Sequence, residues 1–178
     1  CKEMLMCCNT KQKIADTVEE LLCTQPGGRV TVQQVMELTR MNRQSFYYHY
    51  QDINDVLRTI VTRKVCVPLR FDPEETPETW CRRGLTLLKE QRSLLRRISR
   101  ELGDDQVWAL LFLEIRPQVD RLLPVRDGQD PVQREMAVDA ISRSVLLSVA
   151  GLILRGESVN VDASMEKFRA VFSVLDVA

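Results

Sequence analysis

The side chains best equipped for specific chemistry lie together in one short stretch. All three tyrosines and the only histidine fall within "YYHY", residues 47–50, shortly after Asn42, Arg43, Gln44 and Ser45. Arginine and glutamine each present paired hydrogen-bonding groups, and tyrosine joins a hydroxyl to an apolar ring. This mixture is too polar for a helix packed on all sides and too aromatic for an idle solvated face. It predicts a binding surface, with packing against a neighbouring helix as the alternative.

The elements that must position these side chains are predicted to be helices. Thr31 and Gln34 form a capping box that opens a helix of about two turns. Its inward positions are expected to be Val32, Val35, Met36 and Leu38. Upstream, Asn9 and Gln12 form another capping box, which predicts the start of a longer helix that stops at "QPGG", residues 25–28.

The next helix carries the cluster itself. Asn42 is a suitable N-cap, and Met41 and Phe46 occupy the two positions of a hydrophobic staple. Phe46 and Tyr50, four residues apart, are expected to face inward. The outward arc then holds Arg43, Gln44, Ser45, Tyr47 and Tyr48, with His49 near the helix end. Asp52 is expected to cap a following helix whose inward stripe is Ile53, Val56, Leu57, Ile60 and Val61.

Two short helices joined by a tight turn, after a longer one, are the layout of a helix-turn-helix, whose second helix enters the major groove of DNA. Arginine pairs well with guanine and glutamine with adenine, which suits Arg43 and Gln44. Positions for further hydrogen bonds, or for contact with a thymine methyl, are Ser45 and Tyr47. Positions for holding phosphates are Thr31, Tyr48 and His49. A metal or catalytic role for the single histidine is disfavoured because it lies inside the reading helix.

The stretch "VTVQQVMELTRMNRQSFYYHYQDINDVL", residues 30–57, resembles the TetR-like bacterial transcription regulators. The likeness combines the helix spacing, the "SFYYH" core and the amphipathic helix that follows. "RQSFYYHYQDINDVL" is especially similar to the subgroup containing the dihydroxyacetone-kinase operon regulator. The resemblance implies DNA contacts from Thr31, Gln33, Arg43, Gln44, Ser45, Tyr47, Tyr48 and His49, and Asn42 and Gln51 complete the candidate set.

Two places depart from the family pattern. The turn commonly holds Ala-Gly where this chain has Thr39 and Arg40, and the lysine that commonly opens the next helix is replaced by Ile53. The second change removes a phosphate contact, for which Gln51, Asn54 and Arg40 are partial substitutes. The loss of this lysine and the zero net charge favour an alternative, a co-regulator with a degenerate helix-turn-helix that acts through a partner protein.

The second half predicts a helical bundle. The expected helices run from Pro77 to Gly103, from Asp104 with a kink or end near Pro117, from Asp130 and Pro131 to about Arg155 with Gly156 as the stop, and from Asp162 onward. The large aromatic residues of this bundle are Trp80, Trp108 and Phe112. They can line a small-molecule cavity, as the resemblance implies, or form ordinary core. "RSLLRRISR", residues 92–100, is interpreted as a solvated face flanked by Glu90 and Glu101, with a second nucleic-acid surface as the alternative.

The long helix expected from residue 130 predicts a dimer contact. Small residues share one of its stripes and apolar residues an adjacent one, so both sides require burial. One side can face its own bundle and the other a second copy, which resembles the contact made by the last two helices of TetR-like proteins. The candidate interface comprises Ala140, Ser144, Ser148, Gly151, Phe168 and Phe172. A two-fold dimer would present its reading helices about one DNA turn, roughly 34 Å, apart or a multiple of it. The alternative is a central helix in a monomer.

Composition sets the remaining limits. Residues 1–70 hold 10 Lys and Arg against 7 Asp and Glu, as expected of a modest basic module on a neutral body. The six cysteines lack C-x-x-C spacing, so neither a zinc site nor a disulfide framework is indicated, and a reducing cytoplasm is the simplest setting. Cys7 and Cys8 could act as a thiol-based sensor, although buried or frayed cysteines are the commoner outcome. No membrane span, signal peptide or cofactor is expected, although Cys1 indicates that the true N-terminus lies upstream. No phosphate loop or nucleophile elbow indicates an enzyme.

These patterns together predict an all-α protein with two domains. Residues 1–66 are expected to form the helix-turn-helix DNA-binding domain, and residues 67–178 a helical domain that dimerises and can bind an effector. The resemblance implies a homodimeric regulator on a near-palindromic DNA operator. It further implies repression by blocking a promoter, with release by a small-molecule effector.

Overall fold

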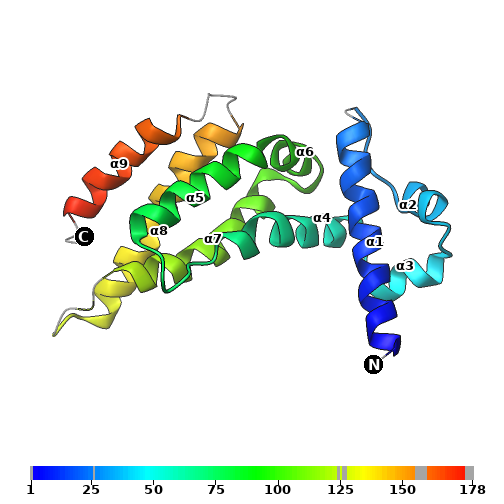
Figure 1. Ribbon diagram of the computed structural model, residues 1–178, viewed down its shortest axis with the longest axis horizontal. Helices are drawn as coiled ribbons and strands as arrows, with labels where there is room; N and C mark the ends of the chain where they lie inside the picture. The colour runs from blue at the N-terminus through cyan, green and yellow to red at the C-terminus, as the bar shows by residue number, and fades with distance from the viewer. Residues whose placement is uncertain (1, 26, 124, 126–127, 155–159, 175–178) are drawn as a thin grey trace. The chain divides into compact units, whose positions relative to one another are not determined.

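The computed structural model describes residues 2–25, 27–123, 125, 128–154 and 160–174, and of these it describes residues 2–9, 148–154, 167 and 171–174 by backbone alone. All regular structure within these ranges is helical (Figure 1), which confirms the all-α expectation for them. The chain divides into two compact units, one of Cys1–Arg63 with Ser93–Val107 and one of Lys64–Arg92 with Trp108–Ala178. The functional boundary at residue 66 stays a prediction.

The first unit is organised around α1 (Lys2–Thr24). Its buried residues, Ile14 and Val18 among them, face α2 (Val32–Thr39), α3 (Arg43–His49) and α4 (Ile53–Val61), and Figure 1 shows α2 and α3 beside α1. The facing helices contribute fully buried side chains at Val35, Phe46, Val56, Leu57 and Ile60. Most of α6 (Arg92–Leu102) also belongs to this unit.

Three helix starts follow from side-chain caps, as the sequence predicts. The Thr31 hydroxyl accepts from the Gln34 backbone N–H at 3.3 Å, and the Gln34 side chain accepts from the Thr31 N–H at 2.9 Å. Asn42 and Asp52 cap α3 and α4, each accepting from the backbone N–H three residues later at 2.8 Å. Each cap satisfies an N–H group that has no partner within its helix. The start of α3 is therefore fixed by its own sequence.

Three other boundaries were predicted wrongly. Helix α1 begins at Lys2 rather than near Asn9, because the upstream Lys, Glu, Met and Leu residues are strong helix formers. The single helix expected from Pro77 to Gly103 is two, α5 (Pro77–Glu90) and α6, because the backbone leaves helical geometry at Gln91 (φ −84°, ψ 3°). The last helix, α9 (Val161–Val174), starts one residue early because the Asn160 side chain caps it, accepting from Ala163 N–H at 3.1 Å.

The second unit contains α5, α7 from Trp108 onward, α8 (Pro131–Leu154) and α9. Helix α5 packs against α9 and α8, and a core cluster joins Trp80, Cys81 and Leu85 of α5 to Met165 of α9. Helix α7 spans Asp104–Leu122 and continues through Pro117, so the helix does not end there. Short turns, η1 (Thr62–Cys66) and η2 (Val67–Leu69), precede α5.

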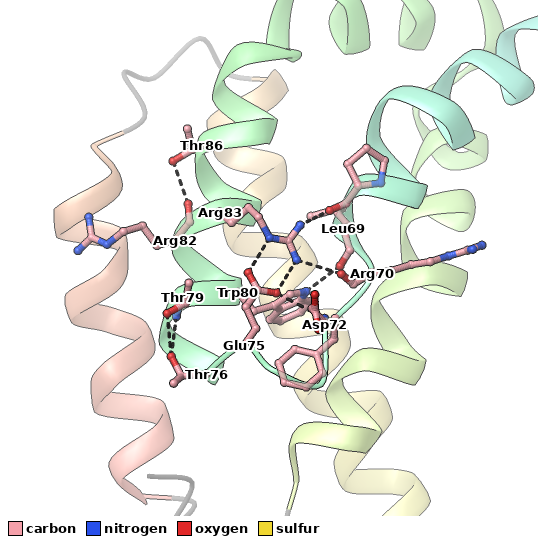
Figure 2. Close-up of polar contacts among 12 residues, drawn as sticks. Leu69, Arg70, Asp72, Glu75, Thr76, Thr79, Trp80, Arg82, Arg83 and Thr86 are labelled. Atoms are coloured by element: carbon pink, nitrogen blue, oxygen red, sulfur yellow. Dashed lines mark hydrogen bonds and ion pairs between the residues drawn. The ribbon is translucent and has the colours of Figure 1, made fainter.

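Arg83 holds the segment that leads into α5 (Figure 2). Its guanidinium makes two 2.7 Å contacts with the Glu75 carboxylate, and it donates to the carbonyl oxygens of Arg70, at 2.9 Å, and Pro68. The hydrogen bond from Arg83 lowers the pKa of Glu75 below its ordinary value. The Trp80 indole N–H donates to the Leu69 carbonyl at 2.7 Å. Both residues therefore fix the backbone of η2 and of Arg70 after it.

Candidate nucleic-acid interface

One edge of α3 is open to solvent. Tyr48 is 77% exposed and Tyr47 47% exposed, and Arg43 and Gln44 are exposed beside them. The Arg43 guanidinium lies over the Tyr47 ring, 5.7 Å from its centroid. Arginine, glutamine and two tyrosine hydroxyls are thus offered from two turns of one helix. This edge combines bidentate hydrogen-bonding groups with apolar rings, as contact with base edges requires.

The opposite side of α3 holds the helix in place. Phe46 has no exposed surface and Tyr50 is 2% exposed. The Tyr50 hydroxyl donates to the Lys11 carbonyl of α1 at 3.2 Å, and burial raises the pKa of Tyr50, so that it remains a donor. The Lys13 ammonium of α1 donates to the Thr39 carbonyl at 3.2 Å, at the end of α2. These contacts tie both short helices to α1 and aim the exposed edge outward.

The remaining candidates surround that edge. Ser45 and His49 are partly buried, and the His49 ring meets Tyr48 edge to face with centroids 4.9 Å apart. Thr31, Gln33, Asn42 and Gln51 are exposed. Gln33 donates to Glu37 at 3.0 Å, and the Gln51 backbone N–H donates to Asp55 at 3.2 Å. The exposed caps at Thr31 and Asn42 place the N-termini of α2 and α3 at the surface, where a helix offers partial positive charge.

The turn between α2 and α3 forms without glycine. Arg40 adopts the left-handed conformation, φ 56° and ψ 34°, and its backbone N–H donates to the Met36 carbonyl. Among the non-glycine residues placed by the structure, Arg40 alone has positive φ. Side chains other than glycine pay roughly 1–2 kcal/mol for this geometry. The left-handed position of this turn is therefore held by arginine, at a cost in stability that glycine would avoid.

Two sequence-based expectations around the site were wrong. Leu38, expected to face inward on α2, is 61% exposed, and Thr39 is buried in its place, with its hydroxyl donating to the Val35 carbonyl at 2.6 Å. Arg97, interpreted as part of a solvated face, and Glu101, interpreted as flanking that face, have side chains only 12% and 5% exposed. The polar partners of Arg97 and Glu101 lie on the loop between α1 and α2. The four-residue spacing of these opposite charges was the one available signal.

The aromatic candidates in the second unit have packing partners. Trp80 is 6% exposed and meets Phe71 edge to face, with centroids 6.4 Å apart. Trp108 and Phe112 are partly buried on α7, and the Arg143 guanidinium lies over the Phe112 ring, 4.8 Å from its centroid. Their role in lining a ligand cavity stays a prediction.

Helix α8 carries an exposed stripe. Ala137, Ala140 and Ser144 are exposed, flanked by Met136 and Leu147, which are 68% and 73% exposed. On α9, Phe168 is partly buried against the Trp80 cluster. Other predictions rest on residues or side chains that lie outside those described: Cys7, Cys8, Ser148, Gly151, Gly156 and Phe172.

Two of the cysteines in the described parts of the chain, Cys66 and Cys81, are buried. Burial raises the pKa of the thiols of Cys66, to about 11, and of Cys81, to about 12, which keeps both protonated at neutral pH. No helix in these parts has the length and apolarity to cross a membrane. Nor do three His, Cys, Asp or Glu side chains gather there as metal ligands would.

Comparisons with known proteins show the fold. No protein-family model matches the chain, and no curated protein matches it by sequence. A solved structure titled "Dihydroxyacetone kinase operon activator DhaS" superposes with a TM-score of 0.71 at 13% sequence identity, covering 94% of this chain and 97% of that one. The chain therefore shares the all-helical fold of that structure over nearly its whole length.

Proposed function

We propose that this chain is a sequence-specific, double-stranded-DNA-binding transcription regulator of TetR type. The observation that supports the proposal most strongly is the open edge of α3, where Arg43, Gln44, Tyr47 and Tyr48 are exposed while Phe46 and Tyr50 anchor the helix from behind. A buried edge would exclude contact with the major groove. The shared fold with a solved operon regulator agrees with this proposal.

In this proposal some residues contact the DNA bases and others the DNA phosphates. Arg43 and Gln44, in the first turn of α3, reach base edges, and Ser45 and Tyr47 add contacts in the groove. Thr31, Gln33, Asn42, Tyr48, His49 and Gln51 lie around them and bind phosphates. Phosphate contacts set the register of the protein on the duplex, whereas base contacts give specificity.

We further propose a homodimer formed through α8 and α9. An exposed stripe of small residues, Ala137, Ala140 and Ser144, lets a second helix approach closely, and Met136 and Leu147 supply apolar surface beside it. Isolated surface apolar residues are ordinary, but a stripe at helical spacing fits a helix of a second copy. A two-fold dimer would bind a near-palindromic operator.

The mode of regulation in this proposal is repression by occupancy of a promoter, released by a small molecule bound in the second unit. The solved regulator with the same fold is titled an activator. A DNA-binding dimer of one architecture can act in either direction, because the outcome depends on where the operator lies relative to the promoter. Transcription in vitro from a promoter that carries the selected operator tests this part of the proposal separately.

Selection from a random duplex pool tests the proposal directly. Wild-type protein should enrich a palindrome, and Arg43→Ala and Tyr47→Ala should each bind the enriched duplex at least about tenfold more weakly, the scale of one good base contact. Matched controls are Arg121→Ala, an exposed arginine of α7, and Val67→Ala, which is exposed to the same 47% as Tyr47. Both controls should bind as wild type does.

The alternative, a co-regulator acting through a partner protein, is favoured by Ile53 at the usual lysine position and by the zero net charge. It predicts that no sequence is enriched, or that Arg43→Ala and Tyr47→Ala bind the enriched duplex as tightly as wild type. Either result would replace the proposed function with this one.

A further inference from the structure

The loop between α1 and α2 is fastened by two side chains of α6. Arg97 donates from one guanidinium nitrogen to the carbonyl oxygens of Gln25, at 3.1 Å, and Gly28. The Glu101 carboxylate accepts from the Val30 backbone N–H at 3.2 Å and lies 3.0 Å from Arg97. One ion pair thus holds both ends of a loop about 70 positions away in sequence.

The ion pair between Arg97 and Glu101 is largely buried, whereas the loop residues Gln25 and Gly28 that Arg97 contacts are exposed. The side chains of Arg97 and Glu101 are 12% and 5% exposed, and Val30 is 5% exposed. A buried N–H without an acceptor is unfavourable, and a buried carboxylate without a cation more so, so the pair and the loop depend on each other. Such a contact is little weakened by salt, in contrast with an exposed ion pair.

The fastened loop leads directly into the start of α2. Val30 precedes Thr31, the N-cap, whose backbone N–H and hydroxyl both meet the Gln34 side chain. Gln34 also donates to the Gln25 side chain at 3.1 Å, at the other end of the loop. The position of Thr31 and of the first backbone N–H groups of α2 is therefore linked, through Gln25 and Val30, to Arg97 and Glu101.

We propose that Arg97 and Glu101 are positioning residues for DNA binding: they hold the loop so that Thr31 and the N-terminus of α2 meet a phosphate. This inference rests on the proposed function, because it concerns how the same DNA surface is arranged. Neither side chain touches DNA. By placing this phosphate contact, they set the position on the duplex at which α3 enters the major groove.

The second unit provides a matched control. Arg83 makes a similar set of contacts, because it too pairs with one carboxylate, that of Glu75, and donates to two backbone carbonyls (Figure 2). We call each set of contacts a clamp: that of Arg97 and Glu101 on the loop between α1 and α2, and that of Arg83 and Glu75 on the segment before α5. Loss of either clamp should destabilise the segment that it holds. Only the clamp of Arg97 and Glu101 adjoins a residue proposed to contact DNA.

The test compares Arg97→Met, Glu101→Gln and the double variant Arg97→Met/Glu101→Met with Arg83→Met. The double variant leaves no buried charge unpaired, so it reports on the clamp even if a single variant fails to fold. Affinity for the selected duplex should fall at least about tenfold in the clamp variants and stay within about twofold in Arg83→Met. Amide hydrogen exchange of the free protein should accelerate at Val30 and Gln34 in the clamp variants only.

A double-variant cycle with Thr31→Ala tests whether Arg97 affects DNA binding through Thr31. If Arg97 acts by placing Thr31, then Thr31→Ala should weaken binding less in the Arg97→Met background than in wild type. Wild-type affinity in the clamp variants, or an equal loss in Arg83→Met, would overturn this inference and leave the proposed function intact. A wild-type chain that enriches no duplex would overturn both.

Discussion

Single residues on α3 divide the helix into an anchor and a binding edge. Phe46 and Tyr50 are buried four positions apart, whereas Arg43, Gln44, Tyr47 and Tyr48 are exposed. With only seven residues, α3 is too short to be stable alone. The Asn42 cap and the contacts of Tyr50 with α1 therefore provide the stability that helix propensity alone does not give to so short a helix.

Arg40 offers a prediction at the residue scale. Its left-handed backbone, φ 56°, is strained for arginine, so Arg40→Gly should raise the free energy of unfolding by about 0.5–1 kcal/mol, once the greater freedom of glycine in the unfolded chain is deducted. Urea denaturation of both proteins measures the difference. The control Arg40→Ala keeps the strain and should show no gain. A less stable Arg40→Gly protein would mean that the Arg40 side chain stabilises the turn through contacts of its own.

Some residues could be placed from sequence and others could not. The spacing of Phe46 and Tyr50, and the capping types at Thr31, Asn42 and Asp52, are local signals, and local signals suffice for short helices with strong caps. Leu38 and Arg97 were misplaced because their environment depends on distant segments. The Arg97 side chain is buried by a loop about 70 residues earlier in the chain, which no local pattern reveals.

Among the helix boundaries too, some follow from local sequence signals and others depend on tertiary packing. Sequence periodicity continues through Gln91, so it predicted one helix where the structure has α5 and α6. The break separates residues that belong to different compact units. Tertiary packing, which periodicity does not report, therefore sets this boundary. The start of α3 was predictable because Asn42 caps it whatever the tertiary context.

The segment that leads into α5 should lose stability in acid. Because the hydrogen bond from Arg83 lowers the folded-state pKa of Glu75, the carboxylate adds stability above its unfolded pKa of about 4.3, and this is lost as pH falls through the lower folded value. Wild type should therefore exceed Glu75→Gln by about 1 kcal/mol at pH 7 and by progressively less below pH about 4. Urea denaturation across this range measures the gap, and a gap unchanged down to pH about 3 would refute the assignment.

The whole molecule should act as a dimer. Ala140→Glu and Leu147→Glu each place a charge on the exposed stripe of α8 and should yield monomers in sedimentation equilibrium, whereas Leu38→Glu, at an exposed apolar position on α2, should not. With about eight phosphate contacts per dimer, the logarithm of affinity should fall with the logarithm of salt at a slope near −7, and at about half that slope for the monomers. An unchanged mass for both α8 variants would place the interface elsewhere.

The central claim is that the exposed edge of α3 reads bases in the major groove. The most direct measurement compares wild type and Arg43→Ala on the selected duplex and on duplexes in which each guanine of a half-site is replaced in turn. Replacement of one particular guanine should weaken wild-type binding about tenfold or more and leave Arg43→Ala binding unchanged, because the partner of that base is already missing. If every replacement weakened both proteins equally, Arg43 would read no base and the claim would be contradicted.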